Sequence, residues 1–164
     1  MLIQNYGLFW QRSDVEWGYP GKGYKGNLLG KYARLRRSTE VDFREQQGVY
    51  VLYDDNFKIV YVGQAGRGDQ RLFTRLRNHK RDHLSQRWSR FSWFGILPVV
   101  DGELNLDFKI DVPDVPSVLN HVEAILLAAA EPPLNLQRGR FGNDVQQYIQ
   151  HCVDEDGDED GEEE

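Results

Sequence analysis

The segment GVYVLYDDNFKIVYVGQA, residues 48–65, constrains the fold of this chain more than any other stretch. It holds two runs of β-branched and aromatic residues, 48–53 and 57–62, around the turn-forming sequence Asp-Asp-Asn. This pattern predicts a β-hairpin. With an even-numbered turn, Tyr50 would pair directly with Tyr61 on one face of the hairpin, where paired Cβ atoms lie about 5 Å apart. An odd-numbered turn would shift this pairing by one residue, and simple ring packing is the alternative explanation of the pair.

The length and composition predict one ordinary domain. The chain has 164 residues, of which 40% are hydrophobic, enough for one core. Its single cysteine, Cys152, excludes an internal disulfide and a CxxC zinc site, and the N-terminus lacks the layout of a signal peptide. The longest apolar run, 124–130, is too short to cross a bilayer. We therefore expect a cytoplasmic protein with no membrane partner.

Charge is distributed unevenly along the chain. Residues 154–164 contain nine acids and no base, whereas the rest of the chain holds 20 basic and 17 acidic residues. Eight of these bases lie within 67–90 and six more within 22–37. Such local basic stripes predict a phosphate-backbone partner, with DNA preferred, and solvated helix faces are the alternative. The acidic tail is predicted to be disordered, either competing with nucleic acid or serving solubility.

The order of apolar, polar and turn segments predicts the domain organisation. Residues 1–47 read as an irregular, basic N-terminal arm rich in glycine and aromatic residues, residues 48–153 as the domain, and residues 154–164 as the tail. Within the domain, we expect further elements by their apolar patterns and caps. These are a helix at 69–84 capped by Asp69, a strand at 91–97, a possible edge strand at 105–111 and an apolar helix at 116–131.

Three charged side chains stand out in the predicted helices. Arg75 and His79 are four residues apart, so they share one helical face. Glu123 lies inside VEAILLAAA, the most apolar helix of the chain. An unpaired buried carboxylate is costly, so Glu123 is expected to face a cation, either Arg75 or a metal. One carboxylate plus waters suits Mg²⁺, and a structural salt bridge is the alternative.

The order of these residues resembles the GIY-YIG nuclease superfamily. The matching elements, which span residues 48–135, are Gly48-Val49-Tyr50, Tyr61-Val62-Gly63, the L-x-x-R-L-x-x-H sequence of 72–79, Glu123 and Asn135. The family includes excision-repair incision subunits, homing endonucleases and some restriction enzymes. The resemblance implies an α+β fold, with a small three-stranded antiparallel sheet flanked by helices.

The resemblance also implies a metal-dependent endonuclease that hydrolyses DNA phosphodiester bonds, with one Mg²⁺ or Mn²⁺ per active site. One of the paired tyrosines, Tyr50 by preference, would activate water after nearby positive charge lowers its pKa. The other implied roles are phosphate stabilisation by Arg75, proton transfer or orientation by His79, metal binding by Glu123 and support of the site by Asn135.

Two departures from the family pattern affect these assignments. Eight residues separate Gly63 from Leu72, more than in the shorter family members, so Arg71 competes with Arg75 for the catalytic position. Arg75 is preferred because only it has a histidine four residues later. Many members carry a lysine directly after the second glycine, where this chain has Gln64. Gln64 is therefore expected to be a neighbour of the site and not a catalytic residue. The expected nucleic-acid-binding residues are Gln64, Arg67, Arg71, Arg77, Lys80 and Arg87.

Other functions remain open from the sequence. A binding module that keeps the fold without cutting nucleic acid is one alternative, and a protein-interaction component that uses the acidic tail is another. As a nuclease, the chain would nick DNA as a monomer or cut both strands as a homodimer. The pathway and the sequence specificity are not encoded in any recognisable motif.

Overall fold

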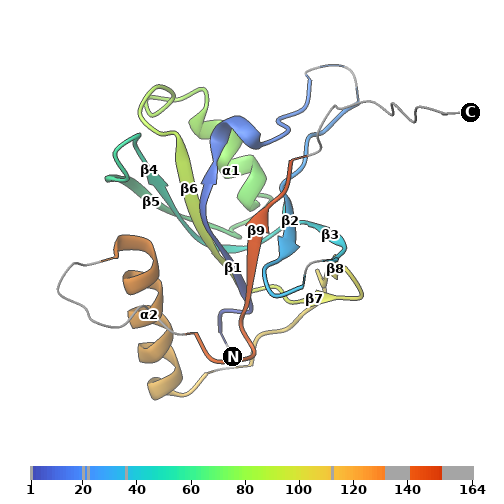
Figure 1. Ribbon diagram of the computed structural model, residues 1–164, viewed down its shortest axis with the longest axis vertical. Helices are drawn as coiled ribbons and strands as arrows, with labels where there is room; N and C mark the ends of the chain where they lie inside the picture. Colours follow the sequence, from blue (N-terminus) through green and yellow to red (C-terminus); the bar gives the residue numbers. More distant parts are fainter. Residues whose placement is uncertain are drawn as a thin grey trace, which may run out of the picture.

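A seven-stranded mixed β-sheet is the main element of the computed structural model, which describes residues 2–19, 21, 23–35, 37–111, 113–131 and 141–152 (Figure 1). The strand order is β3-β2-β9-β1-β6-β4-β5. Two α-helices and a small two-stranded sheet of β7 and β8 accompany it. The bounds are β1 Asn5–Gln11, η1 Arg12–Asp14, β2 Leu29–Tyr32, β3 Glu40–Asp42, β4 Gly48–Tyr53, β5 Ile59–Ala65, α1 Leu72–His79, β6 Arg90–Gly95, β7 Val99–Val100, β8 Glu103–Leu104, α2 Val115–Ala130 and β9 Gln146–Gln150.

This architecture corrects the expected small three-stranded sheet flanked by helices. Strands β4, β5 and β6 are adjacent and antiparallel, as predicted, but four more strands extend the sheet beyond β6. Strand β1 is antiparallel to β6 and parallel to β9. The expectation of an irregular arm is wrong, because β1, β2 and β3 all come from residues 1–47. Local patterns missed them since β2 and β3 are short and since β9 follows β1 by more than 100 residues.

The β4–β5 hairpin has a different register from the predicted one. Tyr50 pairs with Gly63, and Tyr61 pairs with Leu52. The shift between Leu52 and Tyr53 accounts for one residue of the difference, and the pairing of Tyr53 with Ile59 next to the turn accounts for the other. Since the displacement is two residues, both tyrosines stay on the same face. They are diagonal neighbours with ring centroids 6.1 Å apart.

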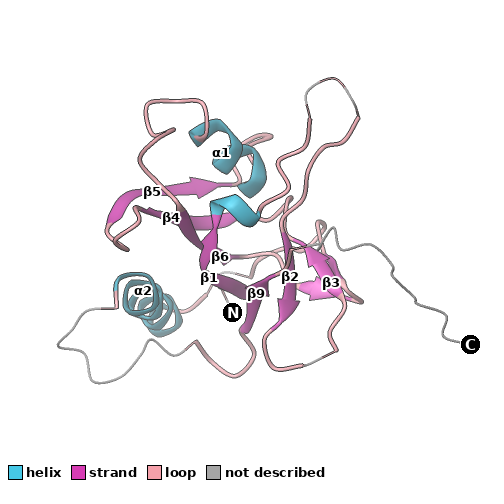
Figure 2. Ribbon diagram, turned by 45° about the horizontal axis from the view of Figure 1, so that its top comes forward, coloured by secondary structure: helices cyan, strands magenta, loops and turns pink. Residues whose placement is uncertain are grey.

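The two faces of the sheet carry separate hydrophobic clusters. On one face, Tyr50 and Leu52 pack with residues of α1 and with the aromatic side chains of β6 and β1. On the other face, Val51 and Tyr53 pack with Ala128 of α2. Figure 2 shows α1 and α2 on opposite sides of β4, β5 and β6. Alternation along β4 therefore divides its side chains between two different environments.

Both predicted helices are present, but α1 is shorter than predicted. The N-cap of α1 is Arg71 rather than Asp69, and the helix ends at His79, five residues early. The α2 helix begins after Asp114, whose carboxylate accepts a hydrogen bond of 2.7 Å from the backbone N–H of Ser117. The possible strand at 105–111 is absent from that described segment. Neither helix is long and apolar enough to cross a membrane, and the described residues include no other α-helix.

Candidate functional site

A chain of hydrogen bonds joins β4 to α1 and to the turn after it. The Tyr50 hydroxyl lies 2.8 Å from Nε2 of His79, and Nδ1 of the same ring lies 2.7 Å from the carboxylate of Asp82. Tyr50 is fully buried and His79 is nearly so. The Asp82 side chain is about one-third exposed. The buried phenol is thus connected to a carboxylate at the protein surface.

Arg75 and Tyr61 complete this cluster from α1 and β5. Arg75 Nε donates a hydrogen bond of 3.3 Å to the Tyr50 hydroxyl. The Tyr61 ring packs against the His79 ring, with centroids 4.7 Å apart. Both Arg75 and Tyr61 are partly exposed. The structure therefore brings together four of the predicted site residues, which we call the tyrosine cluster: Tyr50, Tyr61, Arg75 and His79.

The hydrogen bonds in the cluster are mutually compatible. A neutral His79 ring that donates from Nδ1 to Asp82 leaves Nε2 as an acceptor for the Tyr50 hydroxyl. The Tyr50 oxygen then accepts a hydrogen bond from Arg75. The hydroxyl of Tyr50 and both ring nitrogens of His79 therefore each have a hydrogen-bond partner. Burial alone would raise the pKa of the Asp82 carboxyl, but hydrogen bonds from the Leu84 backbone and from His79 hold it below its ordinary value.

The electrostatics of Tyr50 differ from the sequence-based expectation. Burial raises the pKa of Tyr50 to about 12, although the hydrogen bond and charge of Arg75 act in the opposite direction. Nearby positive charge was expected to lower this pKa, but desolvation is the larger effect. A buried phenol that is harder to ionise is poorly suited to activate water. Of the two tyrosines, Tyr61 is the one whose side chain reaches solvent.

Two glycines of the motif make room for this arrangement. A Cβ atom on Gly63 would lie 2.4 Å from the ring carbon Cζ and the hydroxyl of Tyr50. Gly48 has a φ of +145°, and a Cβ there would lie 1.9 Å from the Phe94 carbonyl oxygen. Both contacts are far below the van der Waals distance. Gly63 therefore permits the Tyr50 ring to cross β5, and Gly48 permits close pairing of β4 with β6.

Arg75 and Arg71 differ in their contacts. Arg75 reaches the Tyr50 hydroxyl, whereas Arg71 lies at the start of α1 and donates to the carbonyl of Gly68. Of the two arginines, Arg75 is therefore the one that contacts a tyrosine of the motif, and its catalytic role stays a prediction. The residue that sequence reasoning missed is Asp82, which orients His79. Its position three residues after the histidine, in the same basic segment, was the available signal.

Glu123 is not part of the tyrosine cluster. Its side chain is exposed on α2, which packs against the face of the sheet opposite Tyr50. The expectation that this carboxylate is buried is wrong, because the buried positions of α2 are occupied by alanines and His121. Within the described part of the chain it forms no ion pair, with Arg75 or any other cation. Asn135 lies outside the described residues.

The expected metal site consists of one carboxylate, Glu123, with water molecules as the other ligands. The described residues contain no group of three or more histidine, cysteine, aspartate or glutamate side chains that could hold an ion. Asp82 is the carboxylate next to the cluster, and its two oxygens already accept hydrogen bonds from His79 and from the Leu84 backbone.

The predicted nucleic-acid-binding residues line the segment around α1. Gln64, Arg67 and Arg87 are exposed. Arg77 lies over the Phe73 ring at 5.4 Å and Lys80 over the Trp17 ring at 4.5 Å. None of the eight arginine and lysine side chains from 67 to 90 forms an ion pair with a carboxylate among the residues that the structure describes. The segment holds two carboxylates, Asp69 and Asp82, so it has an excess of positive charge.

Comparisons with known proteins add no relative. No family model, no curated protein and no solved structure matches this chain. Its function must therefore be argued from the tyrosine cluster and its surroundings.

Proposed function

We propose that this chain is a GIY-YIG-type endonuclease that hydrolyses phosphodiester bonds of DNA at the tyrosine cluster. The observation that carries the proposal is the contact of Tyr50 with both Arg75 and His79. These residues come from separate parts of the chain, in the order that the family motif requires, and they meet at one partly exposed place. The excess of positive charge in residues 67–90, with eight arginine and lysine residues against two aspartates, supports a polyanionic substrate.

The roles of the residues follow from their exposure. Arg75 is partly exposed, and its hydrogen bond to Tyr50 uses Nε. Its remaining guanidinium N–H groups would hold the oxygens of the scissile phosphate. Tyr61, the more accessible phenol, would orient the attacking water. Tyr50 is buried and would position Arg75 and His79, while Asp82 would position the His79 ring.

Plasmid nicking tests the proposal. Purified protein is incubated with supercoiled plasmid in Mg²⁺, in Mn²⁺ and in EDTA, and conversion to nicked or linear form is followed. Arg75→Ala is expected to lower the rate by about 100-fold or more, because it removes a cation that stabilises the transition-state charge. Lys109→Ala is the matched control, since it removes one exposed positive charge outside the cluster. Equal nicking by both variants, or none by the wild type, would contradict the proposal.

A nucleic-acid-binding module that does not cut is the second candidate. It is favoured by the position of Glu123, the expected metal ligand, on α2 at the opposite face of the sheet. This candidate predicts DNA binding that depends on Arg75 with no strand scission under any metal condition. Binding by fluorescence anisotropy, measured on the same preparations as nicking, separates the two functions.

A further inference from the structure

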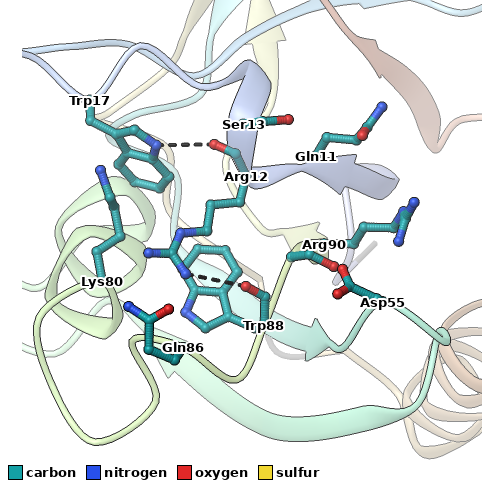
Figure 3. Close-up of a pocket in the computed structure, with 10 residues that line it drawn as sticks. Gln11, Arg12, Ser13, Trp17, Asp55, Lys80, Gln86, Trp88 and Arg90 are labelled. Atoms are coloured by element: carbon teal, nitrogen blue, oxygen red, sulfur yellow. Dashed lines mark hydrogen bonds between the residues drawn. The ribbon is translucent and has the colours of Figure 1, made fainter.

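A concave surface outside the tyrosine cluster lies beside the loop that follows α1, and its volume is about 580 Å³ (Figure 3). It is formed where β1 and η1 meet the segment 80–90. We call it the Arg12–Lys80 pocket. The side chains that line it include Arg12, Trp17, Asp55, Lys80, Trp88 and Arg90.

The pocket contains three cations and one carboxylate. Arg12, Lys80 and Arg90 line it together with Asp55. None of the three cations has an ion-pair partner within the described ranges. Burial lowers the pKa of Lys80, and the positive charges of Arg12 and Arg81 lower it further. Positive charge is therefore concentrated here, and a bound anion would relieve the repulsion.

The cations are held in place by aromatic rings and backbone carbonyls. The Arg12 guanidinium lies 4.7 Å from the centre of the Trp88 ring, and Lys80 Nζ lies 4.5 Å from the centre of the Trp17 ring. Arg12 Nη1 also donates to the carbonyls of Ser85 and Trp88, at 2.6 and 3.2 Å. Figure 3 shows the Arg12 side chain between the two tryptophans. Both hydrogen bonds use Nη1, so Nε and Nη2 are not needed for them.

The pocket is connected to the tyrosine cluster through His79. The His79 ring bonds Tyr50, while its backbone carbonyl accepts a hydrogen bond of 3.2 Å from Trp88 Nε1. Lys80 is the next residue in the chain. His79, at the end of α1, therefore contacts the tyrosine cluster with its side chain and a wall of the pocket with its backbone carbonyl.

We propose that the Arg12–Lys80 pocket binds a backbone phosphate of the DNA substrate, away from the phosphate that is cleaved at Arg75. The proposal rests on the proposed function for the identity of the substrate. A planar arginine fork and a lysine suit phosphate oxygens. Exposed Arg81 and Arg87 flank the same segment, so the surroundings favour a chain of phosphates over a single small anion. Two phosphate sites would set the direction of the strand across the cluster.

Salt-dependent DNA binding tests this inference. A fluorescently labelled DNA duplex is titrated with full-length protein at several KCl concentrations. Lys80→Gln and Arg90→Gln are each expected to weaken binding by about 5–10-fold and to reduce the slope of log K against log salt by about one. Lys109→Gln makes the same charge change outside the pocket and is expected to stay within about twofold of the wild type. Arg12 is not substituted in this test, because it also holds the carbonyls of Ser85 and Trp88 and its removal would change stability as well as binding.

Each outcome supports or overturns the inference. If Lys80→Gln and Arg90→Gln behave like Lys109→Gln, or if the wild type does not bind DNA, the inference is wrong. If inorganic phosphate or a mononucleotide displaces the duplex at a concentration equal to that of duplex phosphates, the pocket is a site for a small anion and the DNA proposal is overturned. Nicking is measured in parallel. Pocket-dependent binding without nicking would contradict the proposed hydrolysis and leave the phosphate site supported.

Discussion

Two tyrosines of β4, three residues apart, show how differently the two faces of the sheet are used. Tyr50 and Tyr53 are both fully buried, and burial raises the pKa of each to about 12. Each hydroxyl is also hydrogen-bonded. Tyr50 contacts two ionisable side chains, His79 and Arg75, whereas Tyr53 donates to the backbone carbonyl of Ala129 at 2.7 Å.

The difference lies in the partners rather than in burial or pKa. A phenol on a backbone carbonyl secures α2 against the sheet and contributes to stability. A phenol between an arginine and a histidine holds a partly exposed guanidinium, which an anion can reach, beside a buried imidazole. A strongly raised pKa is therefore no sufficient sign of a functional site in this protein, because both faces contain one.

Removing each hydroxyl in turn gives the largest contrast between the faces. Tyr50→Phe leaves Arg75 and His79 without their shared partner, so nicking is expected to fall by about 100-fold. Tyr53→Phe is expected to leave nicking unchanged. Tyr50→Phe loses two hydrogen bonds and Tyr53→Phe loses one, and each bond contributes about 1 kcal/mol of unfolding free energy. Nicking rates and urea unfolding curves measure the two effects, and an equal loss of nicking in both variants would erase the distinction.

Alkaline titration shows what the two tyrosines share. An unfolded tyrosine ionises near pH 10, whereas Tyr50 and Tyr53 do so at about pH 12 in the folded state. Since the folded pKa is raised, their stabilising contribution is complete below pH 10 and is lost as the pH rises from 10 to 12. The expected loss is about 2–3 kcal/mol per tyrosine. Tyr148, which is raised likewise, contributes in every variant.

The same titration also separates the faces. Arg75 lowers the pKa of Tyr50 against the effect of burial, so Arg75→Ala is expected to raise that pKa further. The pKa of Tyr53 is expected to stay the same, since Arg75 is not among its influences. Urea unfolding at pH 8, 10 and 11 and NMR of labelled tyrosines measure these changes. A shift of both tyrosines in Arg75→Ala would show that the faces are electrostatically coupled.

Crowding the Tyr50 ring by a substitution at Gly63 is expected to change nicking less than the loss of the Tyr50 hydroxyl. Gly63→Ala places a Cβ atom 2.4 Å from the Tyr50 hydroxyl and 2.8 Å from the Tyr61 ring, so both rings must move. A loss of about 1–3 kcal/mol in unfolding free energy is expected, together with weaker nicking. Val62→Ala is the control on the adjacent position, which is 58% exposed, and it is expected to stay within about 0.5 kcal/mol. A stable, active Gly63→Ala protein would contradict the described packing.

The smallest effect is expected on the far face. Glu123 is exposed on α2, so Glu123→Gln is expected to change the unfolding free energy by less than about 0.5 kcal/mol and to leave nicking unchanged. Asp82→Asn is the informative partner variant, because it weakens the acceptor that orients His79 and is expected to slow nicking. If Glu123→Gln abolishes nicking while Asp82→Asn does not, the assignment of the site to one face is wrong.

Part of the candidate site could be predicted from local sequence. The hairpin pattern around Tyr50 and the four-residue spacing of Arg75 and His79 are consequences of strand and helix periodicity. The shared face of the two tyrosines survived an incorrect register, because a displacement of two residues preserves side-chain direction. The burial of Glu123 was predicted wrongly, because an apolar helix need not bury every position and α2 turns its alanines toward the sheet.

Local sequence is enough to predict strands β4, β5 and β6, the two helices and the clustering of basic residues in and around α1. These depend on periodicity, turn residues and charge, which neighbouring residues specify. Three features depend on long-range packing: β1, β2 and β3 join the same sheet, α1 and α2 cover opposite faces, and Arg12 meets Lys80 in one pocket. Such contacts join residues tens to more than a hundred positions apart, and packing of the whole chain selects them.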